Sequence, residues 1–183
     1  FMRHPVRRTL RFIWFGGEEL GLLGSQAYVR RHAADLKRVK IMLNIDGIGR
    51  VLDPVYGMVA GPDGLQKFVE LIAAEQGLNY GVREAAHSSD SIPFSQHAIP
   101  LIDLSGGVER NLLAHTSNDA VRWCGKEGLE PSGLIALEII RRLGNARVFP
   151  FQRGYNAPAA ASLKKFYENF LPDPGKLPNW CCR

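Results

Sequence analysis

Four short apolar runs divide the chain, and each has about the length of one buried strand. They are Thr9–Phe15, Val39–Ile45, Val55–Ala60 and Ile99–Leu104. β-Branched and aromatic residues are frequent in these runs, and turn residues such as Gly16-Gly17 and Asp46-Gly47 follow them. Runs of this kind are typical of strands inside a sheet. We therefore predict four buried strands.

Segments with apolar residues at helical spacing separate and follow these runs. The expected helices are residues 18–32, Leu65–Gln76, a short one at Phe94–His97, Pro131–Leu143 and Ala159–Phe170. Strands that alternate with helices are typical of an α/β sandwich around a mainly parallel sheet. We find no internal repeat. Residues 1–150 show no interdomain linker, and 151–183, richer in Pro, Gly and Asn, form an expected C-terminal extension with a tail from Leu171.

Composition narrows the class of protein only a little. The 183 residues are 45% hydrophobic and 22% charged, as in ordinary globular domains. No apolar run approaches the roughly 18 residues that a membrane span requires. The net charge of +5 is scattered over loops and helix ends without interleaved aromatic residues. This pattern favours a solvated surface over a nucleic-acid site. The three cysteines (Cys124, Cys181, Cys182) form no C-x-x-C pair, which makes a zinc ribbon improbable.

Candidate chemistry gathers where predicted strands end. Glu18 and Glu19 lie between a predicted strand and a predicted helix. Of two adjacent carboxylates at such a position, one can bind a metal while the other transfers a proton. Asp46 ends the second strand, with Asn44 on the same side by alternation. His115 follows the fourth strand in a loop. Glutamate, aspartate and histidine at one sheet edge form a zinc-compatible set.

Each of these features alone also has an ordinary explanation. A glutamate pair at a helix start complements the helix dipole. Asp-Gly is a common turn dipeptide. A loop histidine is often simply exposed. Asp119, four residues after His115, is expected either to cap the next segment or to hold the imidazole of His115.

Four segments in order resemble the zinc-dependent, leucyl aminopeptidase-like exopeptidases of the co-catalytic two-zinc type. These segments are FIWFGGEELGLLGSQAYV, KIMLNIDGIG, SSDSIPFSQHAIPLIDL and AHTSNDA. The resemblance covers roughly residues 9–145. It implies a three-layer sandwich with a mixed, mainly parallel sheet between helices. Residues 1–150 would then be the C-terminal part of a zinc peptidase catalytic domain.

Carried over by position, the resemblance implies a role for each residue. Glu18 would be the general base, Glu19 and His115 ligands of one zinc, and Asp46 a ligand of the other. Phe94 is an expected wall of the substrate pocket. The substrate would be a peptide with a free N-terminus, and the resemblance favours a secreted or periplasmic location.

The chain also departs from the family pattern. The family's upstream histidine and metal-bridging aspartate are missing, because His4 lies too close to the first strand and no aspartate precedes Asp35. Ser91 stands where a histidine is frequent, and Gly47 where a methionine is frequent. We therefore expect an N-terminally truncated chain, an incomplete metal site and little hydrolysis by this chain alone.

Three other functions stay open at this stage. A relative without catalysis would act as a binding or structural module, although the retained acidic residues and histidine argue against decay. A glutaminyl cyclase or a carboxypeptidase would use the same scaffold, although GGEELGLLGS is more similar to aminopeptidases. A nucleic-acid-binding module rests on net charge alone. Sequence leaves oligomeric state undetermined.

Overall fold

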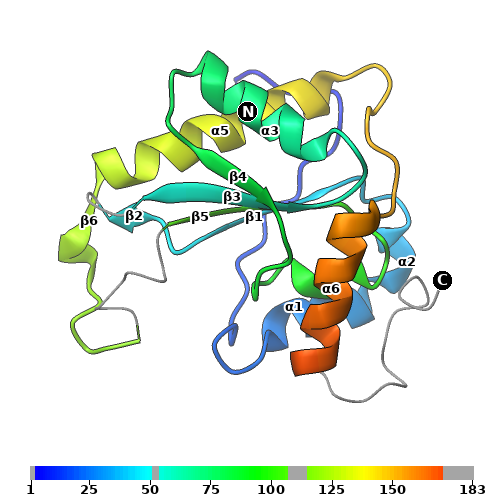
Figure 1. The fold of residues 1–183 in the computed structure, drawn as a ribbon, viewed down its shortest axis with the longest axis horizontal. Coiled ribbons are helices and arrows are strands. Elements are labelled where there is room, and N and C mark those ends of the chain that lie inside the picture. Colours follow the sequence, from blue (N-terminus) through cyan, green and yellow to red (C-terminus); the bar gives the residue numbers. More distant parts are fainter. Residues whose placement is uncertain (1–2, 51–53, 107–114, 171–183) are drawn as a thin grey trace.

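The computed structural model describes residues 3–50, 54–106 and 115–170. Its centre is a four-stranded sheet in the order β1-β5-β3-β4 (Figure 1). The strands are β1 (Met42–Asp46), β5 (Leu101–Gly106), β3 (Val55–Ala60) and β4 (Gly81–Glu84). β1 runs parallel to β5, and β3 parallel to β4, whereas β3 and β5 are antiparallel. The sheet is therefore mixed with mostly parallel pairs, as expected.

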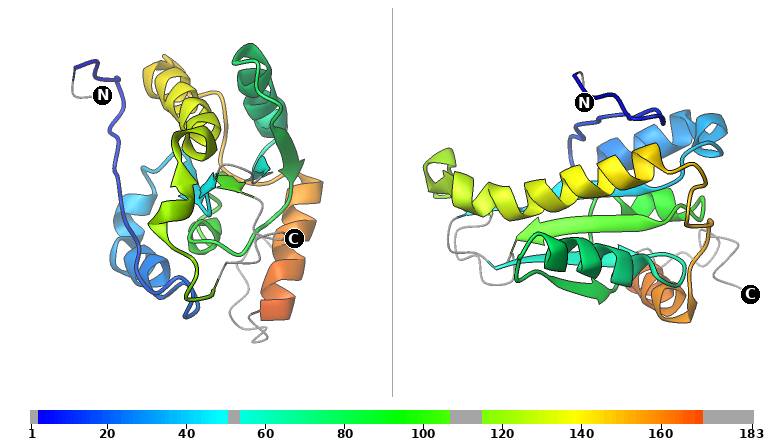
Figure 2. Two further views of the ribbon diagram at one scale, coloured as in Figure 1. Left: turned by 90° about the vertical axis from the view of Figure 1, so that its left-hand side faces the viewer. Right: turned by 90° about the horizontal axis from the view of Figure 1, so that it is seen from above.

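Helices cover both faces of this sheet, which gives three layers (Figure 2). One face carries α3 (Leu65–Glu75) and α5 (Lys126–Asn145), and the other α1 (Leu23–Arg31), α4 (Ile92–Ser95) and α6 (Ala157–Phe170). The remaining elements are short: α2 (Ala33–Leu36), the 3₁₀ turn η2 (Val121–Trp123), and the strand pair β2 (Gly49–Arg50) and β6 (Cys124–Gly125). The α/β sandwich predicted from the sequence is confirmed.

Each layer of helices closes its own hydrophobic core against the sheet. In α3, Leu65, Val69 and Ile72 are fully buried at helical spacing and pack with Ile102 and Ile139. This set forms the upper core. On the other face the fully buried residues include Leu36, Ile99, Leu163 and Tyr167, together with Leu101 of β5. They belong to the lower core, which α6 helps to build.

The prediction of a strand at Thr9–Phe15 is wrong. No described strand pairs with this run, and Phe12 and Trp14 are 61% and 89% exposed. A strand needs a neighbour that accepts its backbone hydrogen bonds, and apolar side chains alone do not supply one. The segment is instead held by side chains, for example Arg11, whose guanidinium donates to the Tyr28 hydroxyl at 2.5 Å.

The helix expected from residue 18 begins later, at Leu23. Gly17, Gly21 and Leu22 have positive φ values of 69°, 102° and 59°, which no α-helix contains. A turn therefore precedes α1.

β4 was not predicted, because its four residues show no apolar alternation long enough to stand out. α5 starts at Lys126 and carries Pro131 within its first turns.

The last helix is capped by a side chain. Asn156 Oδ1 accepts a hydrogen bond from the Ala159 amide at 3.0 Å, as an N-cap asparagine does. Ala159, Leu163 and Tyr167 then bury one face of α6 in the lower core. The domain boundary at residue 150 stays a prediction, and Leu171–Arg183 lies outside the described residues. None of the described helices combines the length and apolar character needed to cross a membrane.

Candidate active site

A tight turn presents Glu18 and Glu19 at the start of α1. The Glu18 carbonyl accepts hydrogen bonds from the amides of Gly21 and Leu22 at 2.9 and 2.8 Å. The Gly24 amide donates to the Gly16 carbonyl at 3.0 Å, which ties α1 to the segment before the turn. A β-carbon at Gly24 would lie 2.5 Å from that oxygen, so only glycine allows this approach. Backbone contacts therefore fix both glutamates.

Glu19 meets the histidine that the sequence pairs with it. His115 Nε2 lies 3.0 Å from Glu19 Oε1, although 96 residues separate them in the chain. Both side chains are well exposed, at 71% and 68%. With Thr116 and Asp119 they line a shallow open hollow. His115 adopts φ 60°, a left-handed conformation uncommon outside glycine.

Glu18 is partly withdrawn from solvent and surrounded by other carboxylates. Burial first, and then the charges of Glu19, Asp46 and Asp90, raise the pKa of Glu18 to about 7, while His115 lowers it. Each of these four charges therefore acts on Glu18. A carboxyl with a pKa near neutrality can both accept and release a proton at physiological pH.

Asp46 and Asp90 complete the cluster. Asp46 ends β1, where its partner in the parallel ladder is Ser105 of β5. Asp90 precedes α4, and its Oδ1 is buried without a hydrogen-bond partner. Burial and the charge of Asp46 raise the pKa of Asp90, while a hydrogen bond from Ser25 lowers it. We refer to Glu18, Glu19, Asp46, Asp90 and His115 as the candidate site.

Comparison with known proteins assigns this chain to a family. The sequence profile described as Peptidase family M28 matches residues 2–140. The chain belongs to peptidase family M28. Among its M28 relatives, aminopeptidase YwaD of Bacillus subtilis is 32% identical over 139 residues. A probable leucine aminopeptidase of Arthroderma benhamiae is 51% identical over 146 residues.

Coverage differs greatly between this chain and those relatives. The two matches span 70% and 75% of this chain, but only 30% and 40% of the relatives. The crystal structure of BSAP, a zinc aminopeptidase from Bacillus subtilis, superimposes with a TM-score of 0.65 at 26% identity. It covers 83% of this chain, which in turn covers 40% of BSAP. The M28 fold is therefore shared over the part of the family that this chain spans.

The donor groups of the candidate site suit the zinc that the M28 family implies. Two ligands of a tetrahedral zinc, each about 2.0–2.1 Å from it, lie about 3.3 Å apart. The Glu19–His115 distance of 3.0 Å is close to this separation. Among residues 3–50, 54–106 and 115–170, however, no three His, Cys, Asp or Glu side chains gather closely enough to hold a metal ion. Glu19 and His115 therefore form a pair of possible ligands. Asp46 lies near Glu18 but does not join this pair in a three-ligand set among the described residues.

Two sequence-based assignments find other surroundings in the structure. Phe94, expected to line the substrate pocket, is only 4% exposed and stacks on Tyr28 with ring centroids 5.9 Å apart. Its ring fills the lower core instead. Asp119 Oδ1 accepts a hydrogen bond from Arg50 at 2.6 Å, so this oxygen is directed to Arg50 rather than to the imidazole of His115.

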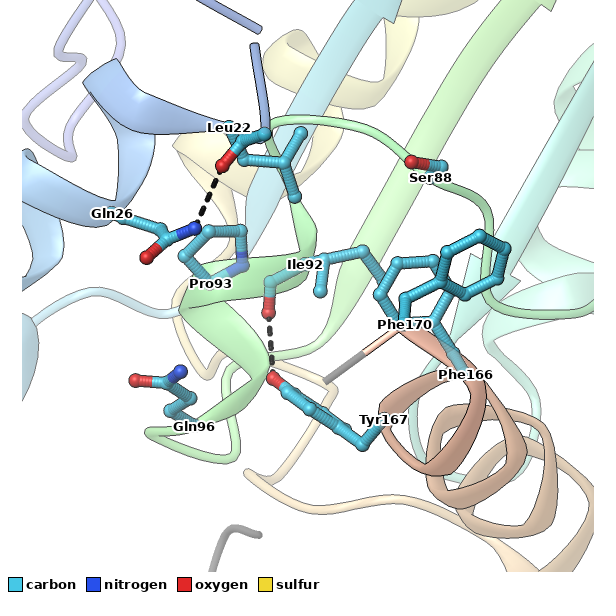
Figure 3. Close-up of a pocket in the computed structure, with 10 residues that line it drawn as sticks. Leu22, Gln26, Ser88, Ile92, Pro93, Gln96, Phe166, Tyr167 and Phe170 are labelled. Carbon is cyan, nitrogen blue, oxygen red and sulfur yellow. Dashed lines mark hydrogen bonds between the residues drawn. The ribbon is translucent and has the colours of Figure 1, made fainter. Parts of the chain in front are cut away.

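An apolar pocket lies beside the Glu18 turn, between α1, α4 and α6 (Figure 3). Leu22 of the turn, Ile92 and Pro93 of α4, and Phe166 and Phe170 of α6 line it. The Tyr167 hydroxyl donates to the Ile92 carbonyl at 3.2 Å and joins α6 to α4. Residues beyond the M28 match at 140 therefore share a pocket with the turn that carries Glu18.

Sequence reasoning gave Asp90 no role of its own. The residue lies within SSDSIPF, a polar segment that resembles the family but has no periodic pattern. Asp103, which lies inside the apolar run Ile99–Leu104, likewise received no predicted role. An aspartate in such a run was the available signal, because a buried carboxylate requires partners of its own.

Proposed function

We propose that the full encoded protein containing this chain removes N-terminal residues from peptides by metal-dependent hydrolysis. The observation that carries this proposal is the Glu19–His115 contact of 3.0 Å beside Glu18. Membership of family M28 supports it, as do relatives named as aminopeptidases. The chain spans less than half of those relatives, so the activity is proposed for the full protein.

Glu19 and His115 would hold one zinc, and Asp46 a second zinc in the complete site. When bound, zinc lowers the pKa of coordinated water and polarises the scissile carbonyl. Glu18 acts as general base: one of its carboxylate oxygens takes the proton from water and later delivers it to the leaving amine. Its pKa of about 7 suits both transfers.

The charge of the candidate site favours a substrate with a free amino terminus. Four of its five side chains are carboxylic acids, and three of them raise the pKa of Glu18. Zinc ions bound to Glu19, His115 and Asp46 would offset part of this charge, and the remaining carboxylates would favour the α-ammonium group of a peptide over the carboxylate at its other end. This charge pattern supports an aminopeptidase over a carboxypeptidase.

A substrate panel on the full encoded protein tests the proposal. We expect hydrolysis of leucine p-nitroanilide, no hydrolysis of its N-acetylated form, loss of activity with a chelator, and recovery with zinc. An N-terminal glutaminyl peptide tests for cyclisation, and an N-blocked dipeptide with a free carboxylate tests for carboxypeptidase activity. Preference for either of the last two substrates, or chelator-resistant turnover, would overturn the proposal.

A further inference from the structure

Asp103 is a buried carboxylate outside the candidate site. It lies in the middle of β5 and is 4% exposed. The Ser89 hydroxyl donates to its Oδ1 at 2.5 Å, and the Ser91 hydroxyl to its Oδ2 at 2.8 Å. Both serines are fully buried. Each carboxylate oxygen of Asp103 therefore has its own hydroxyl partner, as a buried carboxylate needs.

The two serines are the immediate neighbours of Asp90 in the chain. Their hydroxyl oxygens also lie 2.8 Å apart, and the Ser91 amide donates to Ser89 Oγ at 3.2 Å. We call Asp103, Ser89 and Ser91 the Asp103 clamp. Moving the backbone around Asp90 would break these buried hydrogen bonds and leave buried polar groups without a partner, which is unfavourable.

Asp90 needs such a restraint. A hydrogen bond from Ser25 reaches the Asp90 side chain, but its Oδ1 is buried without a partner, and its charge lies within range of both Asp46 and Glu18. Desolvation and repulsion between like charges both favour rotation of this carboxylate toward solvent. The clamp opposes that movement, because it fixes the residues on both sides of Asp90.

The same carboxylate faces β1. Asn44 is the ladder partner of Asp103. Burial raises the pKa of Asp103, and the hydrogen bonds from Ser89, Ser91 and the Asn44 side chain oppose this shift. Asn44 stands two residues before Asp46 on the same side of its strand. Asp103 thus connects the segment that carries Asp90 with the strand that carries Asp46.

We propose that Asp103 is a positioning residue of the active site, which holds Asp90 beside Glu18 through the hydroxyls of Ser89 and Ser91. Its catalytic consequence rests on the aminopeptidase function proposed above, whereas its structural consequence, the place of the Asp90 carboxylate, does not. Asp103 itself would contact neither substrate nor metal.

Variants of the full encoded protein test the catalytic consequence. Asp103→Ala should lower kcat/KM roughly 10- to 100-fold, as does loss of a group that holds an active-site side chain in place. Asp103→Asn should keep most of the wild-type rate, because the asparagine side chain offers one acceptor oxygen and two N–H donors to the same serines. Ser95→Ala is the matched control: Ser95 is also fully buried in this region, but its hydroxyl contacts Tyr167 at 2.7 Å. Zinc content should equal that of the Ser95→Ala variant throughout.

A second variant guards against loss of folding. Ser91→Ala removes only the hydroxyl on Asp103 Oδ2 and should lower kcat/KM in the same direction. In its crystal structure the Asp90 carboxylate should lie farther from Glu18 than in the wild type. Asp90 unmoved, or rates no lower than that of Ser95→Ala, would overturn the inference. A wild type inactive on every peptide would refute the proposed function, and the crystal structures would still decide whether the clamp positions Asp90.

Discussion

Two adjacent glutamates differ in their surroundings although they share one turn. Glu19 reaches outward to His115, whereas Glu18 is partly buried among other carboxylates. The difference arises because successive side chains of a turn leave the backbone in different directions. A proton-transferring group and a metal ligand can therefore occupy neighbouring positions without competing for one partner.

Glu18→Gln in the full encoded protein should abolish hydrolysis and leave the zinc content unchanged. The amide retains the size of the side chain but cannot take a proton from water. The rate and the metal content, by p-nitroanilide assay and elemental analysis, check this expectation. Near-normal turnover of the glutamine variant would remove Glu18 from the role of general base.

Alanine at Glu19, Asp46 or His115 should lower both bound zinc and activity, because each change removes one proposed ligand. Metal content per protein after dialysis is the measurement. His32 and Asp35 supply a matched control, since they form another exposed histidine–carboxylate pair at 3.7 Å, with His32 between α1 and α2 and Asp35 on α2. Alanine at those two positions should leave zinc unchanged. Equal zinc in wild type and in all three ligand variants would contradict the assignment.

At the scale of the element, the position of α1 relative to the Glu18 turn depends on one glycine. A β-carbon at Gly24 would meet the Gly16 carbonyl oxygen at 2.5 Å, directly before the Glu18 turn. At Gly133 in α5, by contrast, a β-carbon would meet nothing within 4 Å. The two helical glycines therefore form a natural pair for comparison.

Gly24→Ala should destabilise the protein by about 1–3 kcal/mol and lower activity, because α1 must move away from the turn. Gly133→Ala should be neutral or stabilising by up to about 1 kcal/mol, since alanine is the better helix former. Urea unfolding and the p-nitroanilide assay on the two variants provide the check. Equal stability and rate in both variants would mean that the close approach at Gly24 has no consequence.

α5 carries a charge network that gives its stability a pH dependence. Glu138, whose side chain is 12% exposed, accepts hydrogen bonds from Arg141 at 2.7 Å and Arg142 at 2.6 Å, and Arg142 also contacts Glu75 of α3. Hydrogen bonds from Arg141, and further bonds and charges from both arginines, hold the pKa of Glu138 at about 2, below its ordinary 4.5. A folded-state pKa lowered in this way stabilises the fold above pH 4.5, and the contribution is lost as pH falls toward 2.

Glu138→Gln should therefore cost about 1 kcal/mol of unfolding free energy at pH 7 and progressively less as the pH approaches 2. Urea denaturation between pH 3 and 7 measures the difference. Glu130→Gln, in an exposed pair with Lys126 at 3.7 Å, should change stability little at any pH. A pH-independent cost at Glu138 would show that packing, rather than charge, is responsible.

The local sequence pattern predicted a strand correctly where neighbouring strands are present and wrongly where the described residues supply none. Val55–Ala60 is a strand over the expected residues, because β4 and β5 pair with it on both sides. Thr9–Phe15 has a similar composition but no described partner strand. Glu18, Glu19, Asp46 and His115 were predicted as site residues from the sequence, although the run before the two glutamates is not a strand. Asp90 and Asp103 acquire their contacts only in the folded chain.

At the scale of the molecule, the two hydrophobic cores differ in their position relative to the candidate site. The upper core, between the sheet and α3 and α5, has no residue in common with the candidate site. The lower core, against α1, α4 and α6, lies beneath the Glu18 turn and the Asp103 clamp. Substitutions that loosen the lower core therefore affect the positions of the site residues more directly than those in the upper core.

α6 shows how far this dependence extends along the chain. It begins seventeen residues past the last position matched by the M28 profile, at 140, yet Ala159, Leu163 and Tyr167 are fully buried against the lower core. A protein shortened at residue 150 would expose apolar side chains of the lower core that α6 covers, and the pocket beside the Glu18 turn would lose Phe166, Tyr167 and Phe170. A shortened version of this chain that ends at the boundary of the family match would therefore lose part of the structure that supports the candidate site.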